Sequence, residues 1–292
     1  MFKGVITAII TPFKLEQGNS VIDYKAWTEF VEWQISEGID GLTLFGTTGE
    51  AATLTTEEKI QLTKVTVEIV NGRIPLIVGS GNNNTKASVE LTQKLKTLGV
   101  DAALAISPYY NKPTQAGLFA HFSAIANEGG LPLILYNIPG RTNVKISTDT
   151  FKKLTKVSGI VGVKQAVDSI SELVELAGVL SGSKIDILAG DDPLVYTVMT
   201  VGGKGVISAS ANVAPRRFKE LVTLANEGKW NEALKVQQEL IPLINALFLE
   251  TNPGPVKSAL EMMGKIPSAS MRLPLVDIMA ETKAELKKVL LT

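Results

Sequence analysis

Short apolar stretches alternate with amphipathic ones along most of the chain. Runs rich in β-branched residues predict eight strands, at residues 5–10, 41–45, 75–79, 102–107, 132–136, 159–164, 185–189 and 205–209. Apolar residues at helical spacing predict a helix after each, at residues 24–36, 56–70, 86–98, 115–127, 148–156, 170–180, 193–201 and 215–227. Strands that are apolar throughout are typical of a parallel sheet covered on both faces. Eight alternating units at this length favour an α/β fold of the (β/α)8 type, a TIM barrel, over an open sheet.

The last part of the chain lacks strand-like runs. From Trp230 onward the pattern predicts only helices, at residues 231–249, 255–263 and 276–291. We therefore predict a barrel domain over residues 1–227, which carries the catalytic groups, and a C-terminal helical appendage over residues 228–292.

The composition of the chain excludes several classes of function. Among 292 residues, 29 Lys and Arg balance 29 Asp and Glu, so no overall field attracts nucleic acid or an anionic membrane. The absence of Cys excludes disulfides and Cys-type zinc sites, and a single histidine, His121, argues against multi-histidine metal centres and a Ser-His-Asp triad. No apolar run approaches the length of a membrane span, and we expect a soluble, cytoplasmic protein.

Polar residues follow the predicted strands at the end where a parallel barrel places its reacting groups. Residues 46–50 (Gly-Thr-Thr-Gly-Glu) combine open backbone amides with two hydroxyls, an arrangement suited to a small carboxylate. The segment lacks the Gly-Lys-Ser/Thr ending of a phosphate-binding loop. An ordinary glycine turn capped by threonines is the alternative interpretation.

Lys164 ends the sixth apolar run. Strand alternation places it on one face with Ile160 and Gly162, and the missing side chain of Gly162 leaves space below the amine. In a dry barrel mouth, desolvation would lower the pKa of the amine and let it attack a ketone. The alternative is a lysine that extends from the strand end to water. Tyr110 and Tyr136 also lie near strand ends; each alone is typical of an amphipathic rim residue, and together they indicate a proton relay.

Two other features favour structural interpretations. Asp192 precedes Pro193 and is expected to cap a helix rather than to bind a metal ion with Asp191. His121 lies in a helical segment, where a structural or surface role is expected.

Six segments together resemble the dihydrodipicolinate synthase family of pyruvate-dependent lyases. They are residues 46–50, 108–113, 135–142, 162–164, 190–192 and 205–208, and the resemblance covers essentially the whole chain. It implies a homotetramer of (β/α)8 barrels, a dimer of dimers, with no metal or organic cofactor. The implied reaction condenses pyruvate with L-aspartate-4-semialdehyde to 4-hydroxy-tetrahydrodipicolinate, in the diaminopimelate route to lysine.

The resemblance also implies catalytic roles. Lys164 would form the Schiff base with pyruvate, and Tyr136 would be the acid and base at the reacting carbon. Thr47 and Tyr110 would complete the proton relay, with Tyr110 reaching into the site of the neighbouring subunit.

Three further residues match substrate-binding positions of the family. Thr48 matches the residue that binds the pyruvate carboxylate, and Ile207 matches one whose backbone carbonyl faces the substrate. Arg141 matches the arginine that orders the semialdehyde carboxylate. The chain departs from the family at Gln165, where many members have glutamate, and at Gly140, where serine is frequent.

Two other functions share parts of this pattern. An N-acetylneuraminate or 2-keto-3-deoxy sugar acid aldolase would use the same Lys164 and Tyr136 with a polyol acceptor. Arg141 favours the synthase, because a guanidinium suits an acceptor that has its own carboxylate. A catalytically silent binding protein would not need the lysine, the threonines and the tyrosines.

Regulation is the last expectation from the resemblance. Lysine-inhibited members of the family have a histidine and a glutamate where this chain has Lys59 and Ala87, whereas Asn83 and Tyr109 match. Loss of a carboxylate and gain of a like charge would weaken binding of lysine. We expect weak or absent feedback inhibition, unless Glu90, one helical turn beyond Ala87, supplies the missing charge.

Overall fold

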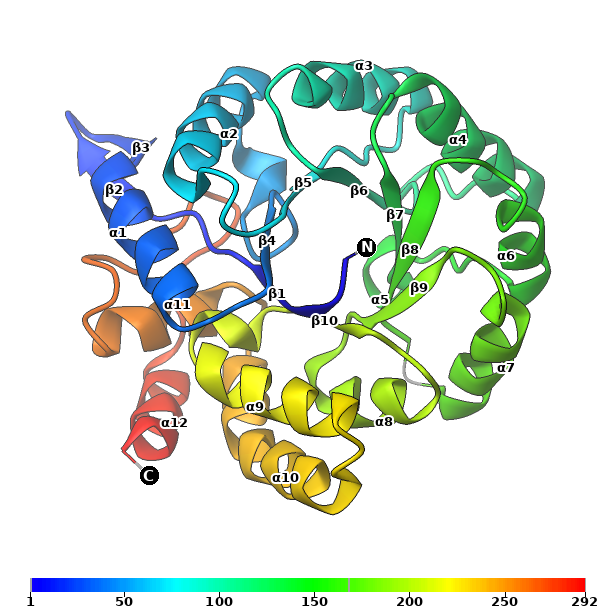
Figure 1. Cartoon of the computed structure of the whole chain (residues 1–292). Helices are drawn as coiled ribbons and strands as arrows, with labels where there is room; N and C mark the ends of the chain where they lie inside the picture. Colours follow the sequence, from blue (N-terminus) through cyan, green and yellow to red (C-terminus); the bar gives the residue numbers. More distant parts are fainter. Residues whose placement is uncertain (1, 168, 292) are drawn as a thin grey trace.

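Within residues 2–167 and 169–291, which the computed structural model describes, eight parallel strands close into a barrel (Figure 1). The order around the barrel is β1-β10-β9-β8-β7-β6-β5-β4, and β4 pairs with β1. The predicted TIM barrel is therefore confirmed. Its strands are β1 (Gly4–Ala8), β4 (Gly41–Leu44), β5 (Leu76–Gly79), β6 (Ala102–Ile106), β7 (Leu133–Asn137), β8 (Ile160–Gln165), β9 (Asp186–Ala189) and β10 (Gly205–Ser208).

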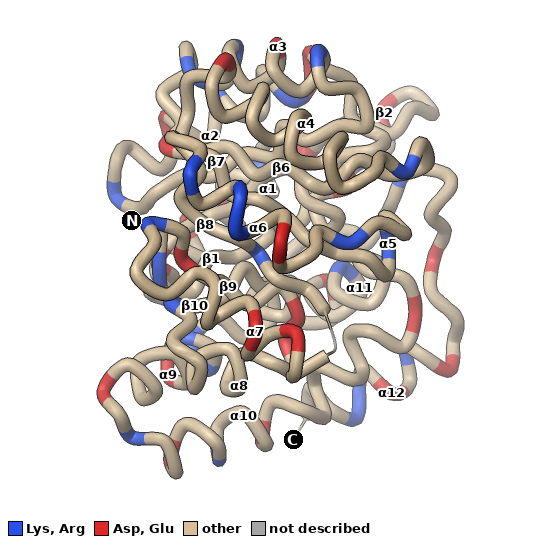
Figure 2. The backbone as a smooth tube through the Cα atoms, turned by 90° about the vertical axis from the view of Figure 1, so that its right-hand side faces the viewer, with Lys and Arg blue, Asp and Glu red and all other residues tan. Residues whose placement is uncertain are grey.

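In the described chain, eight helices form a ring around these strands (Figure 1). Each corresponds to a helix predicted from the sequence, and every end agrees with the prediction to within two residues. Charged residues of both signs are spread over the outside of the molecule, as the equal counts of the two signs lead one to expect (Figure 2). The ring helices are α1 (Tyr24–Ser36), α2 (Thr56–Val70), α3 (Thr85–Lys96), α4 (Gln115–Glu128), α6 (Thr148–Leu154), α7 (Ile170–Leu180), α8 (Val195–Thr200) and α9 (Pro215–Asn226).

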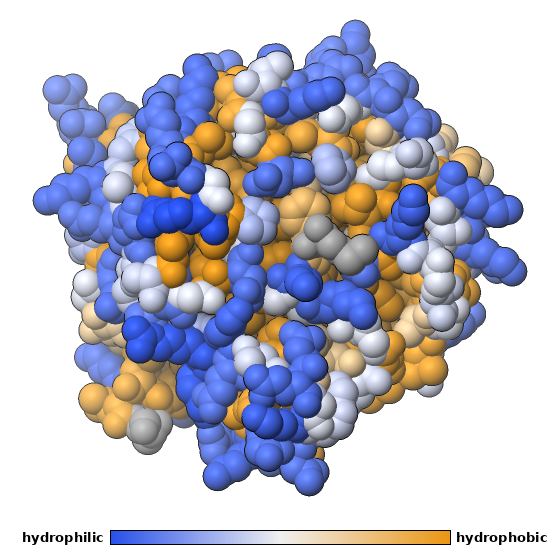
Figure 3. Space-filling view, in the orientation of Figure 1, coloured by the Kyte–Doolittle hydropathy of each residue, from blue (hydrophilic) through white to orange (hydrophobic). Residues whose placement is uncertain are grey.

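The described apolar side chains form two layers, one inside the barrel and one between the strands and the helices. Alternate residues of one strand enter different layers: Leu133 and Leu135 of β7 face the helices, whereas Ile134 and Tyr136 face the barrel interior. This double burial explains why the strands are apolar throughout. On the face shown in Figure 3, hydrophilic residues predominate around the edge, and apolar residues show between them.

Between β1 and α1 along the chain, the residues form a short antiparallel hairpin of β2 (Phe13–Glu16) and β3 (Asn19–Ile22). The sequence pattern did not predict it. Residues 17–18 form its turn with φ of 52° and 81°, and positive φ at both positions is what a two-residue hairpin turn of type I′ requires. Phe13 pairs with Ile22, and both are buried, while the residues nearer the turn are mostly exposed. The apolar signal is confined to one end of the hairpin and is too short to be recognised as a strand.

After the barrel, the described chain continues with three helices, as predicted: α10 (Trp230–Leu247), α11 (Gly254–Met262) and α12 (Ala280–Leu290). α10 packs beside α9 and α8, and α12 packs beside α10 and α11 (Figure 1). The predicted boundary at residues 227 and 228 falls between α9 and α10; the division into two domains stays a prediction. Among the helices described, none is both long enough and apolar enough to cross a membrane.

Short helical turns follow several barrel strands at their C-terminal ends. In the described chain these are η1 (Ala51–Thr53) after β4, α5 (Pro139–Thr142) after β7, η2 (Asp192–Leu194) after β9 and η3 (Ser210–Asn212) after β10. Because parallel strands all end at one rim of the barrel, these turns bring distant polar segments together.

Candidate active site

Among the described residues, two adjoining hollows open near the C-terminal ends of the barrel strands. Their volumes are about 420 Å³ and about 690 Å³. Thr47, Tyr136, Arg141 and Asn252 line both hollows, so the two meet at these side chains. The larger one also reaches Lys164. Residues that the sequence placed at separate strand ends therefore converge on one concave region.

Lys164 is buried, with only 6% of its surface exposed. It lies opposite Tyr136 in the register of β7 and β8, and its Nζ is 4.4 Å from the centroid of the Tyr136 ring. Burial lowers the pKa of the amine to about 8, although the carboxylate of Asp192 acts in the opposite direction. The lysine therefore does not extend to water. Near neutral pH, an appreciable fraction of its amine is neutral and nucleophilic.

Gly190, at the end of β9, makes the room that this lysine needs. A Cβ atom on Gly190 would lie 2.9 Å from Cγ of Lys164, closer than real Cβ contacts. A Cβ atom on Gly162, which the sequence indicated for this purpose, would make ordinary contacts of 3.5 Å with Asp186 and Ile134, and none of its three nearest atoms belongs to the lysine. The glycine that shapes the lysine site thus belongs to the neighbouring strand, where a single-strand pattern could not locate it.

Tyr136 is buried beside the lysine, with 5% of its surface exposed. Burial raises the pKa of the phenol, and the charge of Arg141 and a hydrogen bond with Thr47 oppose that rise only in part. The phenol is therefore neutral at physiological pH, and its hydroxyl can both donate and accept a hydrogen bond.

The loop that carries Thr47 and Thr48, residues 46–50, is held at several points. The hydroxyl of Thr11, which follows β1, donates to the carbonyl oxygen of Gly49 (2.8 Å). Nδ2 of Asn252 donates to Oγ1 of Thr48 (2.9 Å). Thr48 is buried, so its hydroxyl is held in place at the hollow rather than mobile in solvent.

Arg141 lies on α5, directly after β7, and is exposed at the rim of both hollows. The side chain of Asn137 organises this region: its Oδ1 accepts from the backbone N of Ile146 (3.1 Å). Its Nδ2 donates to Oε1 of Gln165 (3.0 Å), which joins the ends of β7 and β8. Gln165, one of the two departures from the family pattern, therefore supports the strands that carry the tyrosine and the lysine.

The expected helix cap at Asp192 is wrong. Asp192 lies within η2, and its Oδ2 accepts from the backbone N of Ser210 (2.8 Å) in η3. The carboxyl group is buried and lines the hollow that contains Lys164, and burial raises its pKa. The contact with Ser210 joins segments 18 residues apart, which local capping rules do not foresee.

Two predicted site residues do not line these hollows. Tyr110 is 90% exposed, and Tyr109 lines the smaller hollow instead. Ile207 is fully buried inside the barrel on β10. His121 also lies elsewhere: it is buried, with Nδ1 2.9 Å from Oγ1 of Thr85, and burial lowers its pKa to about 4, which fits the structural role expected of it.

Asn252 is another site residue that sequence reasoning missed. It follows α10, in the region interpreted as an appendage, yet it lines both hollows and contacts Thr48. Only its position before a Pro-Gly-Pro segment sets it apart in the sequence, and that signals a turn rather than a site.

Comparison with known proteins shows the family to which the chain belongs. The model of the dihydrodipicolinate synthetase family matches residues 1–292. The chain belongs to this family. A 4-hydroxy-tetrahydrodipicolinate synthase from Thermodesulfovibrio yellowstonii is 47% identical over 290 residues, which are 99% of this chain and 98% of that protein.

Solved structures of the dihydrodipicolinate synthase family have the same fold. The enzyme from Thermotoga maritima matches with a TM-score of 0.95 and 38% identity over 99% of this chain and 98% of that one. The chloride-inhibited enzyme from Acinetobacter baumannii, complexed with pyruvate, matches with a TM-score of 0.95 and 42% identity over the same shares. The predicted activity, a Schiff-base-forming lyase of lysine biosynthesis, is confirmed, and the comparisons support the synthase rather than the sugar acid aldolase.

Proposed function

We propose that the larger hollow, together with the region where the smaller one meets it, binds pyruvate and L-aspartate-4-semialdehyde, and that the protein condenses them to 4-hydroxy-tetrahydrodipicolinate through Lys164. The observation that carries the proposal is the buried amine of Lys164, which lies against the ring of Tyr136 at the barrel mouth. A neutral amine there can attack the ketone carbon of pyruvate and form a C–N bond. Loss of the ketone oxygen as water leaves a protonated imine.

The imine makes the adjacent methyl group acidic, because it accepts the electron pair left behind when a proton departs. Because the phenol is neutral, Tyr136 would take that proton while its own proton passes to Thr47, the next group of the relay. Tyr110 would complete the relay from the neighbouring subunit. The resulting enamine carbon attacks the aldehyde carbon of the semialdehyde, and the aldehyde oxygen takes up a proton to become the 4-hydroxyl group.

Release of the product needs no further protein nucleophile. The amino group of the bound semialdehyde attacks the imine carbon, closes the ring and displaces the lysine as a free amine. The two carboxylates have separate partners in this scheme: Thr48 holds that of pyruvate, and Arg141 holds that of the semialdehyde. The backbone carbonyl of Ile207 would face the bound pyruvate from β10.

Trapping the imine tests this assignment. Incubation with pyruvate and borohydride should convert the imine into a stable secondary amine, and mass spectrometry should locate it on Lys164. Lys164→Arg is the control, because it keeps the positive charge but cannot be trapped. If Lys164 stays unmodified while the enzyme is active, the assignment is wrong.

The same proposal includes assembly and location. We expect a homotetramer, as the resemblance to the family implies, and Tyr110, which is 90% exposed in the single chain, would reach a site through a neighbouring subunit. Sedimentation of the active enzyme measures the subunit number. A cytoplasmic location, as expected from the sequence, is tested by cell fractionation.

Regulation by lysine is expected to be weak. Lys59 and Tyr109 line the smaller hollow, so a positive charge lies in the region where the family would bind lysine. Glu90, the possible substitute for a carboxylate at Ala87, already lies 3.8 Å from Lys86, a cation on its own helix. Half-inhibition by lysine at a sub-millimolar concentration would contradict this expectation.

A further inference from the structure

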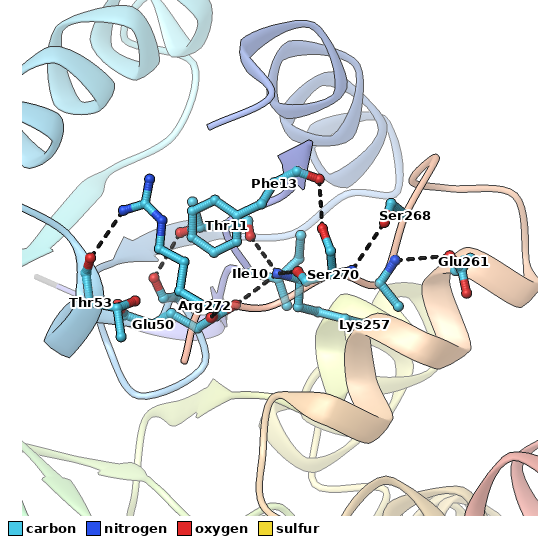
Figure 4. A network of polar contacts seen from close by, with 12 residues as sticks. Ile10, Thr11, Phe13, Glu50, Thr53, Lys257, Glu261, Ser268, Ser270 and Arg272 are labelled. Atoms are coloured by element: carbon cyan, nitrogen blue, oxygen red, sulfur yellow. Dashed lines mark hydrogen bonds and ion pairs between the residues drawn. The ribbon is translucent and has the colours of Figure 1, made fainter. Parts of the chain in front are cut away.

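A buried ion pair connects the Thr47–Thr48 loop to the C-terminal region (Figure 4). Nζ of Lys257, in α11, lies 2.7 Å from Oε1 of Glu50, the last residue of that loop, and both side chains are fully buried. The two residues are 207 positions apart in the sequence. Removing two charges from water is unfavourable by several kcal/mol per ion, and attraction offsets this only in good geometry. An ion pair in this place is therefore a costly way to stabilise a fold.

Lys257 is fixed in a single position. Besides the Glu50 carboxylate, its Nζ donates to the backbone carbonyl oxygens of Thr11 (2.8 Å) and Ser270. The three N–H groups of the ammonium thus have three acceptors. The same nitrogen lies 4.5 Å from the centroid of the Phe13 ring, which closes the remaining side.

Glu50 is held equally firmly. Its second carboxylate oxygen accepts from the backbone N of Arg272 (3.2 Å), in the segment after α11. Its backbone has φ 54° and ψ 39°, a left-handed conformation that side-chain-bearing residues adopt only when their surroundings enforce it. The two C-terminal contacts of the side chain supply that enforcement.

Glu50, which these contacts hold, lies in the same turn as the hydroxyl groups of Thr47 and Thr48. The backbone N of Glu50 donates to the carbonyl oxygen of Thr47 (3.1 Å), and Asn252 holds Thr48. We propose that Glu50 and Lys257 are a positioning pair that sets Thr47 and Thr48 for pyruvate, so that the C-terminal region is a working part of the site. The inference rests on the proposed roles of these two threonines.

Three variants test the pair: Lys257→Met, Glu50→Gln, and the two combined. Each single variant leaves a buried group without its partner and should lower the unfolding temperature. The double variant keeps the side-chain volume without the charges, so its unfolding temperature should recover towards that of the parent. We expect kcat/KM for pyruvate to stay reduced by at least about tenfold in the double variant, mostly through KM, because the loop has lost its anchor.

Glu58→Gln is the matched control. Glu58, at the start of α2, pairs with the guanidinium of Arg272 (2.6 Å), so this change also removes an ion pair between the C-terminal region and the barrel. It removes no contact that Glu50 or Lys257 makes directly. The unfolding temperature should fall, while KM for pyruvate should stay within about twofold of the parent.

Thr48→Val separates failure of this inference from failure of the proposed function. If Thr48→Val leaves KM for pyruvate unchanged, the assignment of Thr48 is wrong and the positioning role is lost with it. If Thr48→Val raises that KM and the double variant matches the parent in pyruvate kinetics, the pair is merely structural and the inference is overturned. Equal losses of kcat/KM in Glu58→Gln and the double variant would overturn it as well.

Discussion

Imine formation at Lys164 should depend on pH with a midpoint near 8. An ordinary lysine side chain has a pKa of 10.5, and burial lowers that of Lys164 to about 8. At pH 7 the neutral fraction rises from about 1 in 3,000 to about 1 in 10, a gain of about 300-fold in reactive amine. The corresponding free energy is about 3 kcal/mol, which arises because the buried ammonium has lost its hydration.

The assay measures the adduct with pyruvate alone, so that the second substrate does not affect the rate. Enzyme and saturating pyruvate are mixed at each pH, quenched after fixed times into borohydride at one common pH, and examined by mass spectrometry. The initial rate should rise with pH and level off above the midpoint, because only the neutral amine attacks the ketone.

Two variants sharpen this test by moving the midpoint in opposite directions. The carboxylate of Asp192 raises the pKa of Lys164, and the guanidinium of Arg141 lowers it. Asp192→Asn should therefore move the midpoint to lower pH, and Arg141→Gln should move it to higher pH. A midpoint near 10 in the parent enzyme, or shifts of the same sign in both variants, would refute the reasoning.

Three further predictions use other contacts of the site. Gly190→Ala should slow adduct formation at Lys164 by at least about tenfold, because the new Cβ lies 2.9 Å from the lysine Cγ, whereas Gly178→Ala, which meets open space, should not. Arg141→Ala should raise KM for the semialdehyde about 10- to 100-fold and KM for pyruvate far less, since a charge-assisted contact contributes about 1.5–3 kcal/mol; equal effects would refute its role. Tyr110→Phe should lower kcat with an unchanged circular dichroism spectrum, and full activity in a verified monomer would show that Tyr110 does not act across an interface.

The barrel could be predicted from the sequence because its signals are local. A strand buried on both faces must be apolar throughout, and a ring helix must present an apolar stripe, so both patterns are legible in short windows. Lys164 was identifiable for the same reason: a charged residue at the end of an apolar strand is unusual wherever the strand packs. The hairpin at residues 13–22 shows the limit, because it buries too few residues to produce a pattern.

The rest of the site depends on contacts between segments far apart in the chain. Gly190 makes room for a lysine on another strand, and Asn252 and Lys257 reach the loop at residues 46–50 from more than 200 residues away. Sequence rules place charged residues such as Glu50 and Lys257 at the surface, because each alone would lose its hydration on burial. Closure of the barrel and packing of α11 against it bring the two charges together, and only that proximity makes their burial tolerable. The sequence alone therefore determined the scaffold and its reactive amine, and the tertiary structure decided which distant side chains hold the amine's neighbours in place.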